Sequence, residues 1–476
     1  MKIPIRALYF AVLFCFGVCG AANAQFATGL DFDDDGYQQV PKKATLTRAL
    51  TVLPAKASIK QYAPYPKSQE QFGTCVAWSG AYCGRTIIEA IKNNWTDRNY
   101  ITANAFSPAF LFRLLEPNDA VCKGGANVED AFSLMKNRGA IPFSALPVQC
   151  VSNLTAEQLS LAANAKIKDF VRLFDIGAAE NLKVQSVKKS IAEKNPVVIA
   201  IRVAPSFQTA RNCWLPVETP AANMGGHAMC VVGFDDNMYG GAFEIQNSWG
   251  QTWGNMGYIW IRYADFANFV KYAFEFVDPP IIAPNVTDLS GEIKLALAGN
   301  TEMPANLLVS TRGLKVVSAN KTAQPLTIYK TNGAYTAGTN FRIYLSNDQP
   351  AYVYAISSDL SNEITRIFPY EDGISAALSY KKNAVAIPDE DHFIQFDDKP
   401  GTDFLCVLYS KNELNINQLI KQVSTQTGTF NEKVFKALGD RLVAPADINF
   451  STDKIAFKGI SKGKEVIAMM VELDHK

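Results

Sequence analysis

Histidine is scarce in this sequence: its 476 residues include only His227, His392 and His475. Charged residues are also few, at 19%, and they nearly balance, with 46 Lys and Arg against 45 Asp and Glu. No stretch gathers Lys or Arg with aromatic residues, so the electrostatic footprint of a nucleic-acid-binding protein is missing. We therefore expect no nucleic acid among the partners.

Long apolar runs are missing outside the N-terminus. There, Lys2 and Arg6 accompany an apolar run over 7–18, and the small residues of 22–24 offer a cleavage site. The run is shorter than the roughly 20 residues that a membrane-spanning helix needs. These features predict a signal peptide over 1–24, no membrane span, and a mature chain that is secreted or periplasmic.

A metal-binding pattern is missing as well. The acidic stretch 31–36 has the D-x-D-x-D-G spacing of a calcium loop, but its twelfth position is Lys42. A calcium loop needs a carboxylate there that binds with both oxygens. We therefore interpret the stretch as a solvated turn and expect no metal and no cofactor.

The chain is too long for one comfortable core, and its 48% hydrophobic content is typical of globular protein. Pro279, Pro280 and Pro284 interrupt the pattern and indicate a linker. The predicted organisation after the signal peptide is a short N-terminal segment or pro-region over 25–55, a first domain over 56–278, a linker over 279–290 and a second domain over 291–476.

The first domain changes from helical to strand patterns along its length. Apolar residues have helical spacing over 75–92 and 128–136. Strand patterns follow over 196–201, 227–234, 242–246 and 257–262. Helices first and strands second predict an α+β domain of two lobes.

Strand patterns dominate the second domain. Turn signals separate them, and one helix is expected near 415–423. We predict a β-sandwich-like module with strands over 341–345, 351–356, 364–368, 404–409 and 466–473.

Nine cysteines are present, and Cys15 and Cys19 fall in the predicted signal peptide, which leaves an odd number. In an oxidising compartment an odd count indicates at least one free thiol. Cys75 is the candidate, because it stands where the loop 71–74 meets a predicted helix, whose positive end lowers a thiol pKa. By itself this is weak evidence, since a lone cysteine at a helix start is more often a small buried hydrophobic residue.

A thiolate nucleophile needs a basic partner, and His227 is the best placed of the three histidines. His392 lies in the acidic stretch 389–392 and His475 lies next to the C-terminus, whereas His227 follows two glycines and begins a buried strand. That setting places an imidazole at a strand entry with room for a substrate backbone.

The segment 246–250, with sequence QNSWG, supplies the third group. The side-chain oxygen of Asn247 can accept a hydrogen bond from one imidazole nitrogen, so that the other nitrogen faces the thiol. Trp249 can screen that hydrogen bond from water. We predict Cys75, His227 and Asn247 as the catalytic residues.

Taken together, the motifs of 56–278 resemble the papain/cathepsin family of cysteine peptidases. The stretch 73–79 resembles the family's nucleophile loop, 226–228 its base, and 247–258 its asparagine segment. The resemblance implies a two-lobed papain-like fold that hydrolyses polypeptides through an acyl-enzyme. It also implies that the amide of Gln69 completes the oxyanion hole.

The same resemblance implies the residues that contact substrate. The stretch 122–125 is similar to the family segment whose last glycine hydrogen-bonds the residue two before the scissile bond. The substrate-binding residues implied in this way are Gly124, Gly125, Gly226 and Trp249.

The sequence also departs from the family pattern. Phe72 stands where the family often has the cysteine that pairs with the counterpart of Cys122, which leaves Cys150 or Cys213 as its partner. Val76 replaces a common Trp. The long helical inhibitory pro-region is missing from 25–55, so the resemblance implies no latency mechanism.

Two rival functions are an amide- or acyl-transferring enzyme on the same scaffold and an inactive peptidase-like binding protein. The presence of Gln69, Cys75, His227 and Asn247 argues against the inactive protein. The β-rich tail resembles the tail of bacterial members, whose role is unknown. It is expected either to bind a cell-surface or protein partner or to act as a stabilising appendage.

Overall fold

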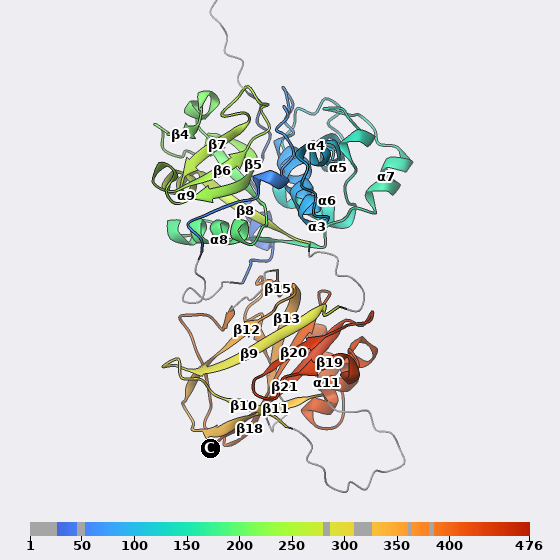
Figure 1. The fold of residues 1–476 in the computed structure, drawn as a ribbon, viewed down its shortest axis with the longest axis vertical. Helices are drawn as coiled ribbons and strands as arrows, with labels where there is room; N and C mark the ends of the chain where they lie inside the picture. Colours follow the sequence, from blue (N-terminus) through green and yellow to red (C-terminus); the bar gives the residue numbers. More distant parts are fainter. Residues whose placement is uncertain (1–25, 45–52, 279–285, 309–325, 360–362, 380–384) are drawn as a thin grey trace, which may run out of the picture.

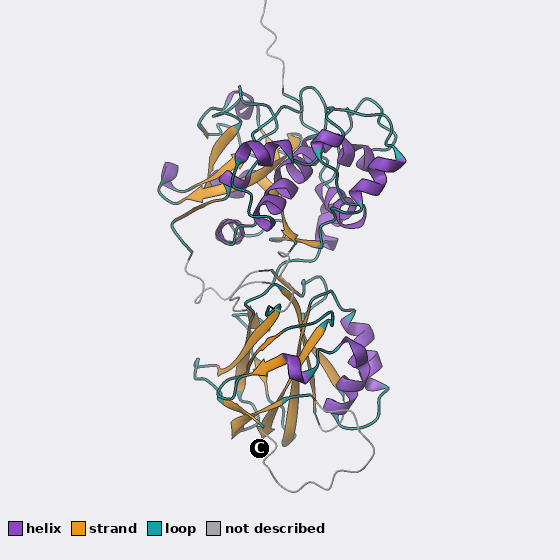
Figure 2. Ribbon diagram, turned by 45° about the vertical axis from the view of Figure 1, so that its right-hand side comes forward, coloured by secondary structure: helices purple, strands orange, loops and turns teal. Residues whose placement is uncertain are grey.

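The computed structural model describes residues 26–44, 53–278, 286–308, 326–359, 363–379 and 385–476 (Figure 1). They form two domains stacked end to end, the first with helices beside a sheet and the second rich in strands (Figures 1 and 2). The predicted signal peptide and much of the predicted linker lie outside the described residues. Within the described ranges, no helix has the length and apolar character to cross a membrane.

Cys75 begins a continuous helix that forms the centre of the first domain. The predicted helix over 75–92 is confirmed, with a π-helical stretch, Trp78–Arg85, in its middle. Residues 75–85 are all buried. Apolar and small residues therefore occur on every side of this stretch, although Ser79 and Arg85 are also buried in it. The other helices of this lobe pack around it. The helices are α1 (Asp34–Gln39), α2 (Cys75–Ala77), α3 (Thr86–Lys92), α4 (Arg98–Ala103), α5 (Pro108–Leu115), α6 (Val128–Asn137) and α7 (Ala156–Ala162).

The second lobe is an eight-stranded sheet in the order β2-β8-β3-β5-β6-β7-β4, with β1 paired to β5. Nearly every residue of β3 is buried, so this strand has a continuous apolar pattern instead of an alternating one. β6 is buried throughout as well, although it includes the polar residues Glu244 and Gln246. The elements are β1 (Lys56–Ser58), β2 (Asp169–Arg172), α8 (Glu180–Ala192), β3 (Val197–Val203), β4 (Cys213–Trp214), β5 (Gly225–Asp235), β6 (Ala242–Gln246), β7 (Tyr258–Arg262), α9 (Tyr263–Phe269) and β8 (Val270–Val277).

The C-terminal domain packs two sheets face to face, which confirms the β-sandwich-like prediction. One sheet has the order β10-β11-β21-β18-β13-β14, with β15 beside β13. The other has the order β16-β12-β9-β20-β19, with β17 beside β12. Two helices, of which only α10 was predicted, cover the outer face of the first sheet. The elements are β9 (Leu289–Leu297), β10 (Ala305–Leu307), β11 (Ile328–Tyr335), β12 (Asn340–Ser346), β13 (Ala351–Ser358), β14 (Ile364–Phe368), β15 (Ala377–Leu378), β16 (Val385–Ile387), β17 (Ile394–Gln395), β18 (Gly401–Ser410), α10 (Ile416–Ser424), α11 (Phe430–Leu438), β19 (Ile448–Phe450), β20 (Ala456–Gly459) and β21 (Val466–His475).

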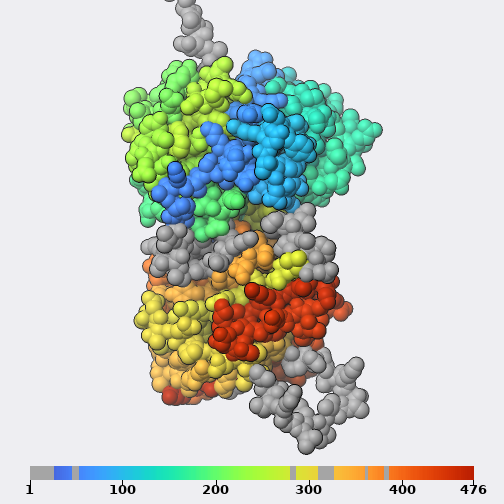
Figure 3. All heavy atoms as spheres, viewed as in Figure 1, coloured from blue at the N-terminus to red at the C-terminus, as the bar shows by residue number. Residues whose placement is uncertain are grey.

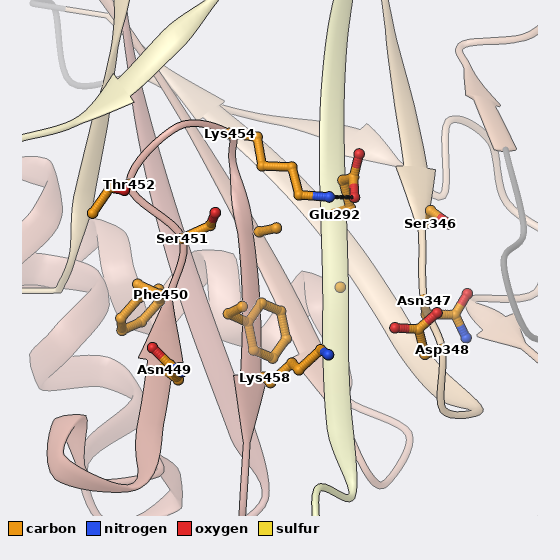
Figure 4. A pocket seen from close by; sticks show the side chains of 13 residues that line it. Glu292, Ser346, Asn347, Asp348, Asn449, Phe450, Ser451, Thr452, Lys454 and Lys458 are labelled. Carbon is orange, nitrogen blue, oxygen red and sulfur yellow. Dashed lines mark hydrogen bonds and ion pairs between the residues drawn. The ribbon is translucent and has the colours of Figure 1, made fainter.

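A hollow of about 790 Å³ lies beside β19 and β20 (Figure 4). Lys454 and Glu292 form an ion pair of 2.6 Å in it, and both side chains are about half exposed. Lys458 and Asp348 also line the hollow. Charges of both signs line the hollow, and binding of a partner by this domain stays a prediction.

One disulfide joins Cys122 to Cys150, so the structure selects Cys150 of the two partners that the sequence left open. Cys213 is a free thiol, as are the buried Cys83 and Cys230. The disulfide closes a loop of 28 residues and ties the segment before α6 to the end of the helical lobe.

We expect Cys150→Ser to lower the free energy of unfolding by about 3 kcal/mol, because the unfolded chain loses the constraint on a loop of this length. Denaturant unfolding of the oxidised protein measures the change. Cys213→Ser, which removes a free and half-buried thiol, is the control and should change the same quantity by less than about 1 kcal/mol. Equal losses in the two variants would contradict a stabilising disulfide.

Candidate active site

The first residue of α2 and the first part of β5 meet where the two lobes join. Cys75 is fully buried, and its thiol lies beside the backbone N–H of Ala228, the residue that follows His227. The structure therefore brings Cys75 and the His227 segment together although they are far apart in the sequence. Cys75 also stands at the N-terminal end of its helix, where backbone N–H groups favour negative charge.

His227 and Asn247 are paired at this junction. The Nε2 atom of His227 lies 2.7 Å from Oδ1 of Asn247, which also accepts a hydrogen bond from the backbone N–H of Ser248. The Trp249 ring lies over the imidazole, with 4.7 Å between ring centroids. Nδ1 of His227 is buried and has no hydrogen-bond partner among the described residues. The imidazole is thus fixed through one nitrogen, and the other is left for a different partner.

Gln69 is buried, and its side-chain amide is held in one orientation. Its Oε1 accepts a hydrogen bond from the Ser248 hydroxyl, and its backbone N–H donates to Ser248 O. The amide nitrogen therefore points the other way, where it donates to the backbone oxygens of Phe72, at 2.8 Å, and Ala27, at 3.2 Å. The predicted role of Gln69 in the oxyanion hole requires its amide nitrogen to be the group that faces the cleft, and this orientation provides that.

Residues 26–31, which we call the occluding segment, run between the two lobes and make backbone hydrogen bonds to both. Phe26 stacks on Trp249 at 4.9 Å, and the backbone oxygen of Ala27 accepts hydrogen bonds from Trp249 Nε1 and Gln69 Nε2. The backbone N–H of Gly29 lies beside the Cys75 thiol. The segment therefore covers the candidate nucleophile.

The far end of the occluding segment forms backbone bridges to both lobes. Leu30 N–H donates to Gly226 O, and Asp31 N–H donates to Ala126 O, whose own N–H donates to Gly29 O. The Leu30 side chain is buried in the core of the helical lobe. Both lobes therefore hold the segment in place.

The glycines predicted to bind substrate differ in what they contact. A Cβ on Gly226 would lie 2.3 Å from Leu30 O, and one on Gly125 would lie 2.4 Å from an Asp31 carboxylate oxygen, so both line the space that the segment fills. The backbone N–H of Gly124 instead donates to the Asp119 side chain.

Ala126 was not predicted as a site residue. The resemblance had led us to expect backbone hydrogen bonds from the last glycine of 122–125 to a substrate. In the structure Ala126 makes such backbone hydrogen bonds to the occluding segment. It contributes only backbone atoms, so its side chain gave no signal in the sequence.

Comparison with known proteins identifies the first domain. Residues 62–273 match the papain family of cysteine proteases. The chain is 32% identical over 246 residues to an uncharacterized peptidase C1-like protein of Acanthamoeba polyphaga mimivirus, covering 48% of this chain and 70% of that protein. The chain belongs to the papain family of cysteine peptidases.

Other relatives of this papain-family chain are more distant. It is 27% identical over 207 residues to cathepsin K of Mus musculus and 23% identical over 225 residues to cysteine proteinase 3 of Entamoeba histolytica. These matches cover 42% and 47% of this chain, and it spans 56% and 67% of the length of those relatives. Residues 334–413 match a domain of unknown function (DUF4384).

Two solved structures similar to this papain-family chain are xylellain, a cysteine protease from Xylella fastidiosa, and digestive procathepsin L 3 of Tenebrio molitor larval midgut. Xylellain gives a TM-score of 0.43 at 20% identity and covers 54% of this chain and 97% of its own. The procathepsin gives 0.40 at 18% identity and covers 53% of this chain and 83% of its own.

The covered state of the papain-family site holds its two titratable groups neutral. Burial raises the pKa of the Cys75 thiol to about 12, although the backbone N–H groups of Ala228 and Gly29 oppose the shift. Burial also lowers the pKa of His227 to about 4, with the hydrogen bond to Asn247 opposing it. Between those values the pair consists of a thiol and a neutral imidazole, which is not the ionised form that attacks a carbonyl.

A buried carboxylate lies under α1, the helix that follows the occluding segment. Glu129 is 6% exposed, and neither carboxylate oxygen has a hydrogen-bond partner elsewhere in the described part of the chain. Burial, reinforced by the charges of Asp130 and Asp33, raises its pKa to about 7. Above that pH an unpaired charge is buried between α6 and α1. This charge disfavours the closed arrangement, in which α1 packs on α6 and the occluding segment covers Cys75.

We expect Glu129→Gln to raise the free energy of unfolding by about 1–3 kcal/mol at pH 8 and to change it little at pH 4.5. The sign follows because the pKa is raised in the folded state. The wild-type carboxyl is protonated at low pH, and its cost develops as the pH rises from about 4.5 through about 7. Thermal or denaturant unfolding at the two pH values measures the effect.

Glu157→Gln is the matched control, because it makes the same chemical change at an exposed position of α7, and its charge does not act on Glu129. It should shift the stability by less than about 0.5 kcal/mol at either pH. A gain from Glu129→Gln that is as large at pH 4.5 as at pH 8 would contradict the assignment to the buried charge.

Proposed function

We propose that this protein is a cysteine endopeptidase in which Cys75 is the nucleophile, His227 the acid and base, and Asn247 the residue that orients the histidine. The observation that carries the proposal is the pairing of His227 Nε2 with Asn247 at 2.7 Å beside the buried Cys75. This geometry leaves Nδ1 for the thiol. Membership of the papain family supports the same chemistry.

The reaction would proceed through an acyl-enzyme. The Cys75 thiolate attacks the peptide carbonyl, and the oxyanion receives hydrogen bonds from the Cys75 backbone N–H and Gln69 Nε2. The protonated His227 gives its proton to the leaving amine, and the neutral imidazole then takes a proton from water as water releases the acyl group. The reaction needs no metal or cofactor by this route.

The occluding segment occupies the place proposed for the substrate, and it runs in the opposite direction. In the resemblance to the family, the substrate residue two before the scissile bond lies at the last glycine of 122–125, and the scissile carbonyl points to Gln69. In this chain Ala27 lies at Gln69 and the later Asp31 lies at Ala126. The peptide polarity at Cys75 is therefore reversed, which supports the interpretation of the segment as an inhibitor instead of a substrate.

Two measurements test this proposal. An epoxide that alkylates thiols irreversibly should label Cys75, as mapped by peptide mass spectrometry of the full chain. Digestion of a mixed peptide library with an added amine should give peptides with new free carboxyl termini. Amine-capped products in their place would establish a transferase. Absence of Cys75 labelling both in the wild-type chain and in Gly29→Ala, whose added methyl group clashes with Gly73 and displaces the occluding segment, would remove the nucleophile assignment.

We also propose that the chain is exported and cleaved after Ala24. The disulfide Cys122–Cys150 supports an oxidising compartment. Cleavage there would place the new N-terminus next to Phe26, at the start of the occluding segment. N-terminal sequencing of the protein from its native cells should begin near Gln25, and a retained Met1 would contradict the proposal.

A further inference from the structure

We propose that the C-terminal domain holds the occluding segment in the cleft by clamping residues 42–44, and thereby keeps the peptidase closed. The proposal rests on the proposed function, because it describes how the site at Cys75 is regulated. It assigns a role to a domain whose matching family is described as one of unknown function. The clamp is formed by the backbone of Lys42, the side chain of Lys43 and the burial of Ala44.

Lys42 lies between the two domains. Its own backbone is hydrogen-bonded to the C-terminal domain, and the backbones of its two neighbours are hydrogen-bonded to the first domain. Its N–H donates to Gly373 O at 2.6 Å, and its carbonyl accepts from Ser375 N–H at 2.8 Å. On the other side, Lys43 N–H donates to Arg172 O, at the end of β2. Residues 41–43 therefore act as an added strand between the edge strand β2 and the C-terminal domain.

The side chain of Lys43 joins the domains a second time. Its Nζ contacts Glu275, on β8 of the first domain, and donates to Ser379 Oγ of the C-terminal domain at 3.1 Å. The Ser379 hydroxyl also donates to Glu275 at 3.0 Å. Glu275 is fully buried, so Lys43 supplies the counter-charge that its carboxylate needs.

Ala44 ends the clamp inside the second domain. It is 4% exposed and packs in the core cluster that otherwise consists of residues of the C-terminal domain, among them Ile374. A side chain from the N-terminal segment thus completes the core of the domain that follows the peptidase. Separating the domains would expose Ala44 and break the hydrogen bonds of Lys42.

The clamp is connected to the occluding segment through α1. The Asp33 side chain caps this helix, and Tyr37 anchors it by donating a hydrogen bond to Phe174 O and stacking on Tyr272. The buried charge of Glu129 opposes this seating. An element with an unfavourable charge beneath it depends on its anchors, and one anchor, at 42–44, is shared with the C-terminal domain.

The rate at which an epoxide alkylates Cys75 in the full chain reports how often the cleft opens. Ala44→Glu places a charge in the core of the C-terminal domain, so we expect it to raise that rate at least 5-fold. Gln39→Glu adds the same charge at an exposed position of α1 and is the matched control. Hydrogen exchange of the Leu30 and Asp31 amides should accelerate in Ala44→Glu and not in Gln39→Glu.

Ser379→Ala is a milder second variant, in case Ala44→Glu fails to fold. It removes one bridging hydroxyl from the C-terminal domain and should raise the alkylation rate about 2-fold. Gly29→Ala, which disrupts the occluding segment itself, separates the possible results. If Gly29→Ala is alkylated faster but both clamp variants match Gln39→Glu, the C-terminal domain is not the clamp. If Cys75 is not alkylated even in Gly29→Ala, the proposed nucleophile fails instead.

Discussion

Cys75→Ala should abolish peptide hydrolysis, with a loss of kcat/KM of at least about 1,000-fold, while the fold is retained. The size of the loss follows because the sulfur forms the covalent bond of the proposed mechanism, and no other group in the site can replace it. Alanine is close to the thiol in size and Cys75 is fully buried, so the change leaves at most a small cavity. Turnover of a fluorogenic peptide, with circular dichroism as the check on folding, measures both quantities.

Cys213→Ser is the matched control for that experiment. Cys213 is a free thiol in the same domain, on β4, and it is not part of the cleft. It should keep nearly all activity. If Cys75→Ala retained full activity, or if Cys213→Ser lost as much as Cys75→Ala, the nucleophile would have to be reassigned.

The residues proposed for the chemistry could be selected from the sequence, and the way in which the structure covers them could not. Cys75, His227 and Asn247 are recognisable because each needs a particular side chain in a particular local setting. The occluding segment makes most of its contacts through backbone atoms, as at Ala27, Gly29 and Ala126. Backbone hydrogen bonds leave little trace in residue type, so the sequence indicated only a short segment before the domain.

Similar limits explain the other differences. The disulfide partner of Cys122 depended on how two loops approach each other, which no local pattern records. The strand patterns of the C-terminal domain predicted its sandwich because both kinds of strand leave a signal: β12 alternates between buried and half-buried residues, and β13, covered on both faces, is apolar nearly throughout. Glu129 and Lys43 acquire their properties only from burial between segments far apart in the chain, which is a consequence of the tertiary fold.

The surface of the closed molecule illustrates the same point. In Figure 3 the C-terminal domain lies below the first domain. The N-terminal segment contacts residues from three parts of the chain, at Gly226, Ala126 and Gly373. Each contact is separated from the segment by a long stretch of sequence, so the tertiary arrangement alone determines its position.

Gly29→Ala should raise the rate of Cys75 alkylation at least 10-fold in the full chain. A Cβ at this position would lie 2.0 Å from the backbone oxygen of Gly73, in the loop that leads to Cys75. Gly73 is held by the hydrogen bond from its N–H to Cys122 O, and the occluding segment by the bridge from Leu30 to Gly226. A single methyl group should therefore displace the occluding segment. A clash that costs about 1.4 kcal/mol already increases the open population tenfold.

The pH dependence of the same reaction provides an independent check. Removing the segment exposes Cys75 and His227 to water, which should lower the pKa of the thiol from about 12 and raise that of the imidazole from about 4. The pH at which alkylation reaches half its maximal rate should therefore fall in Gly29→Ala relative to the wild type. Gln38→Ala, at an exposed position of α1, is the control and should leave the profile unchanged.

The contribution of His227 to the pH dependence of closure follows from the sign of its pKa shift. A pKa lowered in the closed state means that the open state binds a proton more readily, so the closed state loses stability as the pH falls from about 6.5 toward 4. Protonation of Glu129 stabilises the closed state over the same pH range. The comparison is therefore made in chains that carry Glu129→Gln, where acid should narrow the difference in alkylation rate between Gly29 and Gly29→Ala. A constant ratio of the two rates from pH 8 to pH 4.5 would show that the segment does not control the ionisation of the pair.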